Sequence, residues 1–98
     1  MNLEITPLAA HEKLRSTTIQ LLDVRSPEEH AEDHLDGLLI PLPELAENWQ
    51  QLDKTLTTIV YCHAGVRSYW AAKFLQAQGF TEVYSLAGGI AAWRRAGY

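Results

Sequence analysis

Cysteine is almost absent from this chain of 98 residues, which contains only Cys62. One cysteine cannot close an internal disulfide, form a CxxC redox pair or build a cysteine-based zinc site. Cys62 is therefore either a small buried apolar residue or a lone reactive thiol.

Long apolar runs and clusters of positive charge are also missing. The apolar stretches fall well short of the roughly 20 residues that a membrane helix needs, and residues 1–14 lack the pattern of a signal peptide. Eight Lys and Arg residues against twelve Asp and Glu residues give a net charge of −4, and no basic run exceeds Arg94-Arg95. We therefore expect a soluble, cytoplasmic protein that binds neither nucleic acid nor membranes.

The length and an apolar content of 47% allow one modest core without disulfides or structural metal. No repeat, low-complexity tract or linker interrupts the sequence. We expect a single domain over residues 1–98 that acts as a monomer.

Short apolar segments alternate with helical patterns along the whole chain. Strands are predicted at 19–24, 57–61 and 82–86, with shorter candidates at 3–5 and 38–40. Helices are predicted at 7–15, after Ser26, and at 43–52, 68–78 and 90–95. This alternation predicts an α/β domain with a mostly parallel sheet of four to five strands, flanked by helices. Trp49, Trp70 and Trp93 are predicted to lie in the core, with the rim of a pocket as an alternative for Trp70.

The segment after the strand at 57–61 combines features that activate a thiol. Cys62 would lie at the carboxyl end of this strand, facing the N-terminus of the helix expected from about Ser68. Gly65 can adopt the positive φ that turns successive backbone N–H groups inward, and such a nest stabilises an anion. We expect that anion to be the Cys62 thiolate, with a lowered pKa.

Arg67 strengthens this interpretation. A cation in the first turn of a helix is unfavourable by a few tenths to about 1 kcal/mol unless an anion lies beside it. We expect a thiolate, a persulfide or an anionic substrate to be that partner.

Four ordered motifs resemble those of the rhodanese family of sulfurtransferases. They are Asp23-Val24-Arg25, then Glu29 with the segment 33–37, then the loop 62–68 as CxxGxR[ST], and 86–93 as LxGGxxxW. Asp33 and Leu38 depart from the family pattern, which usually has Gly and Ala there. The resemblance implies a three-layer rhodanese-like domain.

The resemblance also implies a chemistry that uses one thiol and no cofactor. Cys62 would be the catalytic nucleophile, taking sulfane sulfur from a donor such as thiosulfate or a persulfide and carrying it as a persulfide. A thiol, including one on a protein, or cyanide would then accept the sulfur in a ping-pong mechanism. The residues expected to bind the substrate and the persulfide are His63, Ala64, Gly65, Val66, Arg67 and Ser68.

Other polar residues are weaker candidates for a functional role. Asp23 and Arg25 are possible supporting residues that would fix loops by hydrogen bonds and ion pairing, with Glu29 as a candidate partner. His63 would either contact the donor or face solvent. His30 and His34 have a zinc-binding spacing, but the Glu of an HExxH motif and a third ligand are missing, so no metal is expected.

Two other classes of function stay open at this point. Phosphatases and arsenate reductases that resemble rhodaneses have an HCxxxxxR loop, whereas four residues separate Cys62 from Arg67 and Tyr61 precedes Cys62. The smaller loop is a poorer cradle for a tetrahedral oxyanion. A non-catalytic interaction module is the second alternative, which the intact Cys62, Gly65 and Arg67 disfavour.

Overall fold

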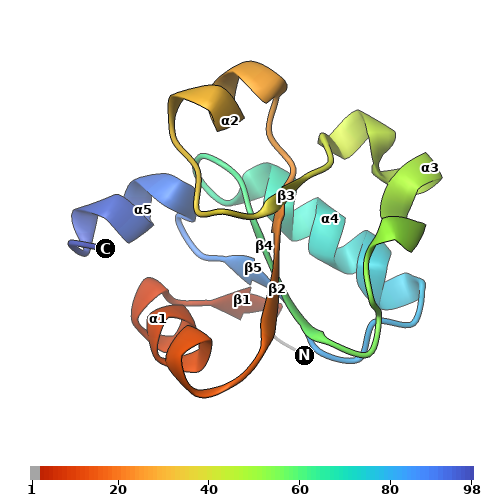
Figure 1. Ribbon diagram of the computed structural model, residues 1–98, viewed down its shortest axis with the longest axis horizontal. Helices are drawn as coiled ribbons and strands as arrows, with labels where there is room; N and C mark the ends of the chain where they lie inside the picture. The colour runs from red at the N-terminus through yellow and green to blue at the C-terminus, as the bar shows by residue number, and fades with distance from the viewer. Residues whose placement is uncertain (1–2) are drawn as a thin grey trace.

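A parallel sheet of five strands organises the computed structural model, which describes residues 3–98 (Figure 1). The strands are β1 (Glu4–Ile5), β2 (Ile19–Asp23), β3 (Leu38–Leu39), β4 (Thr57–Tyr61) and β5 (Val83–Leu86), in the order β1-β5-β4-β2-β3. Every paired strand runs parallel to its neighbour. The α/β fold with a parallel sheet is therefore confirmed, while residues 1 and 2 of the expected domain lie outside the described residues.

Helices cover both faces of the sheet and complete three layers. They are α1 (Pro7–Ser16), α2 (Pro27–Glu32), α3 (Leu45–Asn48), α4 (Val66–Ala77) and α5 (Gly89–Arg95). One buried cluster joins α1 and α5 to one face of the sheet, and a second joins α3 and α4 to the other. Because successive side chains of a strand point to opposite faces, Ile59 and Tyr61 face α5 whereas Val60 and Cys62 face α4.

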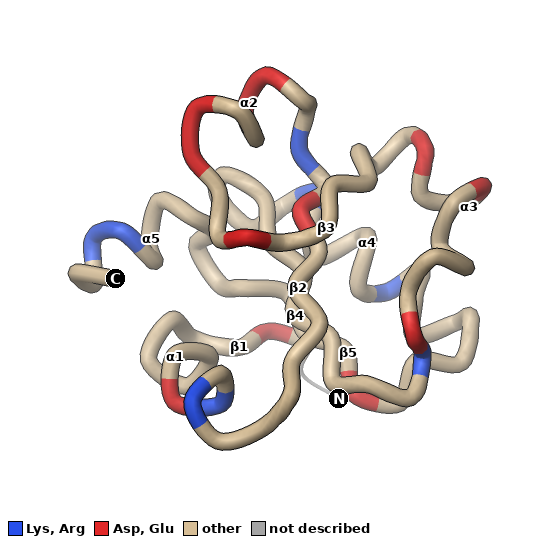
Figure 2. Tube along the Cα trace, in the orientation of Figure 1, with Lys and Arg blue, Asp and Glu red and all other residues tan. Residues whose placement is uncertain are grey.

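Local capping signals form as predicted at two helices. The Thr6 Oγ1 accepts a hydrogen bond from the N–H of Ala9 at the start of α1. Ser26 and Glu29 form a complete capping box at the start of α2. These caps fix where the two helices begin. The second cap also places Glu29 at the edge of the site described below, on a helix whose charged residues are glutamates (Figure 2).

Two predicted helices differ from the structure. The helix expected at 43–52 is an α-helix only at α3, flanked by the 3₁₀ turns Leu42–Glu44 and Trp49–Gln51, and Leu45 and Leu52 are nevertheless buried. The segment begins with Pro41 and Pro43, which donate no backbone hydrogen bond and leave a short, tightened structure. Helix α4 begins at Val66 instead of Ser68, because Gly65 in the left-handed conformation ends the loop early.

The three tryptophans occupy different environments. Trp93 is buried and Trp49 packs, half-buried, against Phe80. Trp70 is 58% exposed, so its predicted core position is wrong. The face of α4 that meets the sheet is formed by positions 68, 71, 72 and 75, and Trp70 lies outside it. No helix within residues 3–98 has the length and apolar character needed to cross a membrane.

Candidate active site

The sulfur of Cys62 is the centre of a buried cluster of hydrogen bonds at the carboxyl end of β4. The N–H groups of Gly65 and Ser68 donate to Cys62 Sγ at 3.1 and 3.4 Å, and the Ser68 hydroxyl lies 3.4 Å from the same atom. Burial raises the pKa of the Cys62 thiol, but hydrogen bonds from Ser68, Gly65 and Ala64 outweigh burial and hold the pKa below its ordinary value. The arrangement favours a thiolate, which is the nucleophilic form.

Contacts with α5 fix the first part of the loop around the sulfur. The carbonyls of Cys62 and His63 accept hydrogen bonds at 2.9 and 3.2 Å from the amides of Ile90 and Ala91, at the start of α5. In a trans peptide the N–H points opposite to the carbonyl, so the Ala64 amide, which follows the His63 carbonyl, turns away from α5 and toward Sγ. Gly89, with φ +65°, leaves no space for a Cβ beside those two carbonyls.

A chain of buried hydroxyl groups extends from the cysteine to β5. Ser68 Oγ lies 2.7 Å from Ser85 Oγ, and Ser85 Oγ lies 3.5 Å from the carbonyl oxygen of Gly65. Both serines are fully buried. Ser68 is among the loop residues predicted from the sequence, whereas Ser85 is not, because its only signal in the sequence is a hydroxyl in an otherwise apolar strand.

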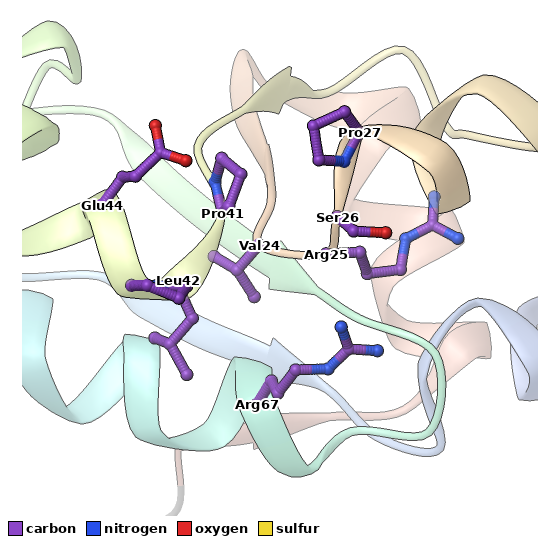
Figure 3. A pocket seen from close by; sticks show the side chains of 9 residues that line it. Val24, Arg25, Ser26, Pro27, Pro41, Leu42, Glu44 and Arg67 are labelled. Carbon is purple, nitrogen blue, oxygen red and sulfur yellow. The ribbon is translucent and has the colours of Figure 1, made fainter.

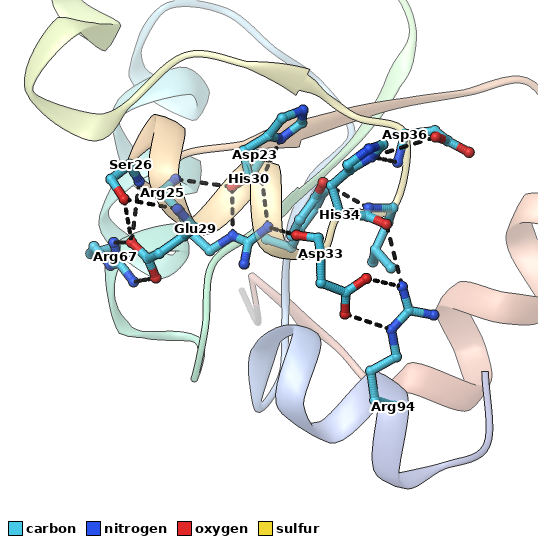
Figure 4. A network of polar contacts seen from close by, with 12 residues as sticks. Asp23, Arg25, Ser26, Glu29, His30, Asp33, His34, Asp36, Arg67 and Arg94 are labelled. Carbon is cyan, nitrogen blue, oxygen red and sulfur yellow. Dashed lines mark hydrogen bonds and ion pairs between the residues drawn. The ribbon is translucent and has the colours of Figure 1, made fainter.

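Arg67 forms a two-pronged ion pair with Glu29 of α2 (Figure 4). The Arg67 Nη1 and Nη2 atoms lie 2.8 and 2.9 Å from Glu29 Oε1 and Oε2. The hydrogen bonds from this guanidinium lower the pKa of Glu29 to about 2. A partner of Arg67 that the sequence did not indicate is therefore the carboxylate of Glu29, 38 positions away, in addition to the expected thiolate, persulfide or substrate.

Asp23 and Arg25 hold the connection between β2 and α2 and do not contact the sulfur in any hydrogen bond within residues 3–98. Arg25 Nε and Nη2 donate to the two carboxylate oxygens of Asp23 at 2.9 and 2.8 Å, and the Arg25 amide donates to the same carboxylate. His30 Nδ1 lies 2.9 Å from Asp23 Oδ2. Burial raises the pKa of Asp23, yet these hydrogen bonds hold it below its usual range. Glu29 pairs with Arg67 and not with Arg25.

Asp33 continues the same polar network toward α5 (Figure 4). Its carbonyl accepts a hydrogen bond from Arg25 Nη2, and its carboxylate binds Arg94 Nε and Nη2 at 3.0 and 2.6 Å. The backbone of Asp33 is extended, with φ −166°. This conformation does not need glycine, which explains how an aspartate is accommodated at this position.

The other loop residues face outward. His63, Ala64 and Val66 are exposed, and His63 makes no side-chain hydrogen bond within residues 3–98. The His30 and His34 rings stack at 4.4 Å between centroids, while His30 also binds Asp23. In the part of the chain that the structure describes, no three His, Cys, Asp or Glu side chains are placed to hold a metal ion.

A pocket of about 330 Å³ lies next to the cysteine loop (Figure 3). It opens between the connection from β2 to α2, the segment before α3 and the first turn of α4. The residues that line it are Val24, Arg25, Ser26, Pro27, Pro41, Leu42, Pro43, Glu44 and Arg67. Arg67 thus belongs both to the pocket and to the turn that surrounds the sulfur.

Comparisons with known proteins agree on one family. The model of the rhodanese-like domain matches residues 6–96. The chain is 36% identical over 92 residues to the thiosulfate sulfurtransferase GlpE of Coxiella burnetii, covering 93% of this chain and 86% of that protein. It is 34% identical over 96 residues to a sulfurtransferase of Allochromatium vinosum, covering 96% of this chain and 90% of that protein.

A solved structure shows the same fold. The crystal structure of a rhodanese-related protein from Thermoplasma volcanium superposes with a TM-score of 0.87 at 31% sequence identity. The match covers 97% of this chain and 93% of the other chain.

Proposed function

Because the chain belongs to the rhodanese-like domain family, we propose that it is a sulfurtransferase in which Cys62 carries sulfane sulfur as a persulfide. The observation that carries this proposal is the set of hydrogen bonds on Cys62 Sγ, from the amides of Gly65 and Ser68. Such donors stabilise the thiolate before the reaction and the anionic persulfide after it.

In the first half-reaction, the Cys62 thiolate attacks the outer sulfur of a donor such as thiosulfate. A bond forms between Sγ and that sulfur, and the bond between the two sulfur atoms of thiosulfate breaks. Its electron pair leaves with sulfite, so no oxidant or reductant is required. The product on the protein is the Cys62 persulfide anion, surrounded by the amides that held the thiolate.

In the second half-reaction, an external acceptor removes the outer sulfur and restores the Cys62 thiolate. Cyanide would leave as thiocyanate, and a thiol would leave as a persulfide. Cys62 is the only cysteine of the chain, so no second thiol of this chain can attack its persulfide. The acceptor therefore has to come from outside.

Arg67 attracts and orients the anionic donor in this scheme. A guanidinium carries five N–H groups, and the contacts with Glu29 use two of them. The remaining groups can bind sulfonate-type oxygens without breaking the ion pair. Glu29 thereby acts as a positioning residue, because it fixes the plane of the guanidinium in the pocket next to the cysteine loop.

The experiment that tests the proposal is intact mass measurement after treatment with thiosulfate. We expect a mass increase of one sulfur atom, which disappears on reduction and does not form in Cys62→Ser. No added sulfur with any of several sulfane donors would favour a non-catalytic module. Hydrolysis of a generic aryl phosphate that is lost in Cys62→Ser would instead favour a phosphatase.

A further inference from the structure

The pocket beside the cysteine loop has a rigid apolar wall. Its apolar residues are Val24, Leu42, Pro27 and Pro41 (Figure 3), together with Pro43, so three of the four prolines of the chain line the pocket. A proline ring fixes φ, so little conformational freedom is lost when a ligand binds against it. A small hydrated dianion such as thiosulfate gains nothing from this surface, whereas an organic carbon skeleton does.

Apart from the N–H groups of Arg67 that Glu29 does not use, the charges around the pocket disfavour an anionic ligand. Both guanidinium groups in the lining are already paired, Arg25 with Asp23 and Arg67 with Glu29. Glu44 lies across the pocket from Arg67 (Figure 3), and its carboxylate forms no ion pair within residues 3–98. The charged groups of the lining and their partners therefore sum to a negative value, to which a Cys62 persulfide would add.

The pocket also lies next to the loop that surrounds the reacting sulfur. Val24 and Leu42 belong to or pack against the same buried cluster as Cys62. Arg67 lines the pocket and lies between Gly65 and Ser68, whose amides donate to Sγ. A ligand that fills the pocket can therefore present its end group to the cysteine loop.

We propose that this pocket binds the sulfur acceptor, and that the acceptor is a small organic thiol with an apolar body and no negative charge apart from its reacting sulfur. The inference rests on the proposed function, since it concerns the second half-reaction. The thiol sulfur forms a bond to the outer sulfur of the Cys62 persulfide, and the bond from that sulfur to Sγ breaks. Its electron pair returns to Sγ, the proton of the thiol goes to solvent, and the acceptor leaves as a persulfide anion.

The test compares acceptors whose thiols have the same alkyl chemistry. Protein loaded with thiosulfate and desalted is mixed with 3-mercaptopropanol, 6-mercaptohexanol or 6-mercaptohexanoate, and discharge of the sulfur is followed by intact mass. Each buried methylene is worth roughly a factor of four. We expect 6-mercaptohexanol to react at least about tenfold faster than 3-mercaptopropanol and several-fold faster than 6-mercaptohexanoate.

Variants of the pocket separate binding from general effects on the fold. Leu42→Asn and Pro43→Asp should bring the ratio of the discharge rates with 6-mercaptohexanol and 3-mercaptopropanol close to one. Leu8→Asn is the matched control, because Leu8 is an exposed leucine on α1, and it should keep the wild-type ratio. Glu44→Gln should reduce the difference in discharge rate between 6-mercaptohexanol and 6-mercaptohexanoate, whereas Glu47→Gln on α3 should leave this difference unchanged.

The inference is overturned if the wild-type ratio between the alcohols is near one, if the carboxylate reacts faster than the alcohol, or if both pocket variants keep the wild-type ratio. A titration of Cys62→Ser with 1-hexanol, monitored by the methyl NMR signals of Val24 and Leu42, measures the pocket without sulfur chemistry. Shifts of these signals that appear with 1-hexanol but not with hexanoate support the ligand class. This support holds even if Cys62 takes up no sulfur, because that result would refute only the proposed function. Absence of shifts with 1-hexanol refutes the pocket assignment.

Discussion

The hydroxyl oxygens of Ser68 and Ser85 lie 2.7 Å apart in the interior, and Ser68 links this pair to the sulfur of Cys62. A hydroxyl can donate one hydrogen bond, so the direction of the chain depends on the cysteine. When Cys62 is ionised, Ser68 donates to Sγ and Ser85 donates to Ser68. When Cys62 is protonated, the three groups can donate in the reverse order, ending on the Gly65 carbonyl.

This relationship predicts that both serines control the ionisation of the thiol. Ser68→Ala removes a donor to the thiolate, so the pKa of Cys62 should rise and alkylation by iodoacetamide at pH 7 should slow by about tenfold. Ser85→Ala should act in the same direction with a smaller effect. The measurement is the pH dependence of the alkylation rate, with Ser16→Ala on α1 as the control. The role of the two hydroxyl groups would be contradicted if both variants showed the same pH profile as the wild type.

The ion pair between Glu29 and Arg67 predicts a pH-dependent contribution to stability. The pKa of Glu29 falls from 4.5 to about 2 on folding, so the stabilisation is complete above about pH 4.5 and is lost as the pH falls toward 2. Because about a third of each side chain is exposed, solvent limits the effect. Glu29→Gln should cost about 1 kcal/mol in the free energy of unfolding at pH 7 and almost nothing near pH 2.

Urea denaturation of both proteins at several pH values measures this difference. Glu28→Gln is the matched control, since Glu28 is an exposed neighbour in the first turn of α2. The interpretation fails if the loss in free energy of unfolding caused by Glu29→Gln does not change with pH, or if Glu28→Gln causes the same loss.

The approach of α5 to the cysteine loop predicts that Gly89 cannot be replaced. Gly89→Ala places a Cβ against the carbonyls of Cys62 and His63 at a positive φ, and should destabilise the fold by more than about 3 kcal/mol. Gly97→Ala is the control, because Gly97 has φ +92° but no atom near the added Cβ. It should cost only about 1 kcal/mol, the strain of the backbone itself. Thermal unfolding distinguishes the two, and equal changes in Tm would refute the role of the contact.

The geometry of Arg67 predicts that its charge alone is insufficient. Arg67→Lys keeps the charge but loses the planar fork that binds both oxygens of Glu29. Loading of Cys62 from thiosulfate should slow by about tenfold, the effect of losing roughly 1.4 kcal/mol of oriented hydrogen bonding. Arg95→Lys at the exposed end of α5 should load at the wild-type rate. A wild-type loading rate in Arg67→Lys would show that only the positive charge matters.

Features encoded by neighbouring residues could be predicted from the sequence. The strands at 19–23 and 57–61 follow from apolar, β-branched segments, and the start of α2 follows from the capping box of Ser26 and Glu29. The left-handed conformation of Gly65 likewise agrees with its place between a strand and a helix. Each of these features depends on contacts between residues only a few positions apart, so the local sequence carries the signal for it.

Contacts that depend on the order of the strands could not be predicted in this way. Glu29 reaches Arg67 because β2 and β4 are neighbours in the sheet, and Ser85 reaches Ser68 because β5 lies on the other side of β4. Nothing local to either partner indicates these pairs. The exposure of Trp70 was also missed, because an apolar residue at the margin of a helical stripe can be buried or exposed according to what packs beside it.

The depth of the cysteine has a consequence for which atom of a persulfide can react. A thiol can attack either sulfur: attack on the outer one transfers the cargo, whereas attack on the inner one releases hydrogen sulfide and leaves a mixed disulfide on the protein. Cys62 is only 1% exposed, so its own sulfur would be the inner, shielded atom, and the outer sulfur would extend about 2 Å farther. In the proposed reaction, burial of one atom would thereby direct attack to the outer sulfur and keep the protein from being left as a mixed disulfide with the acceptor.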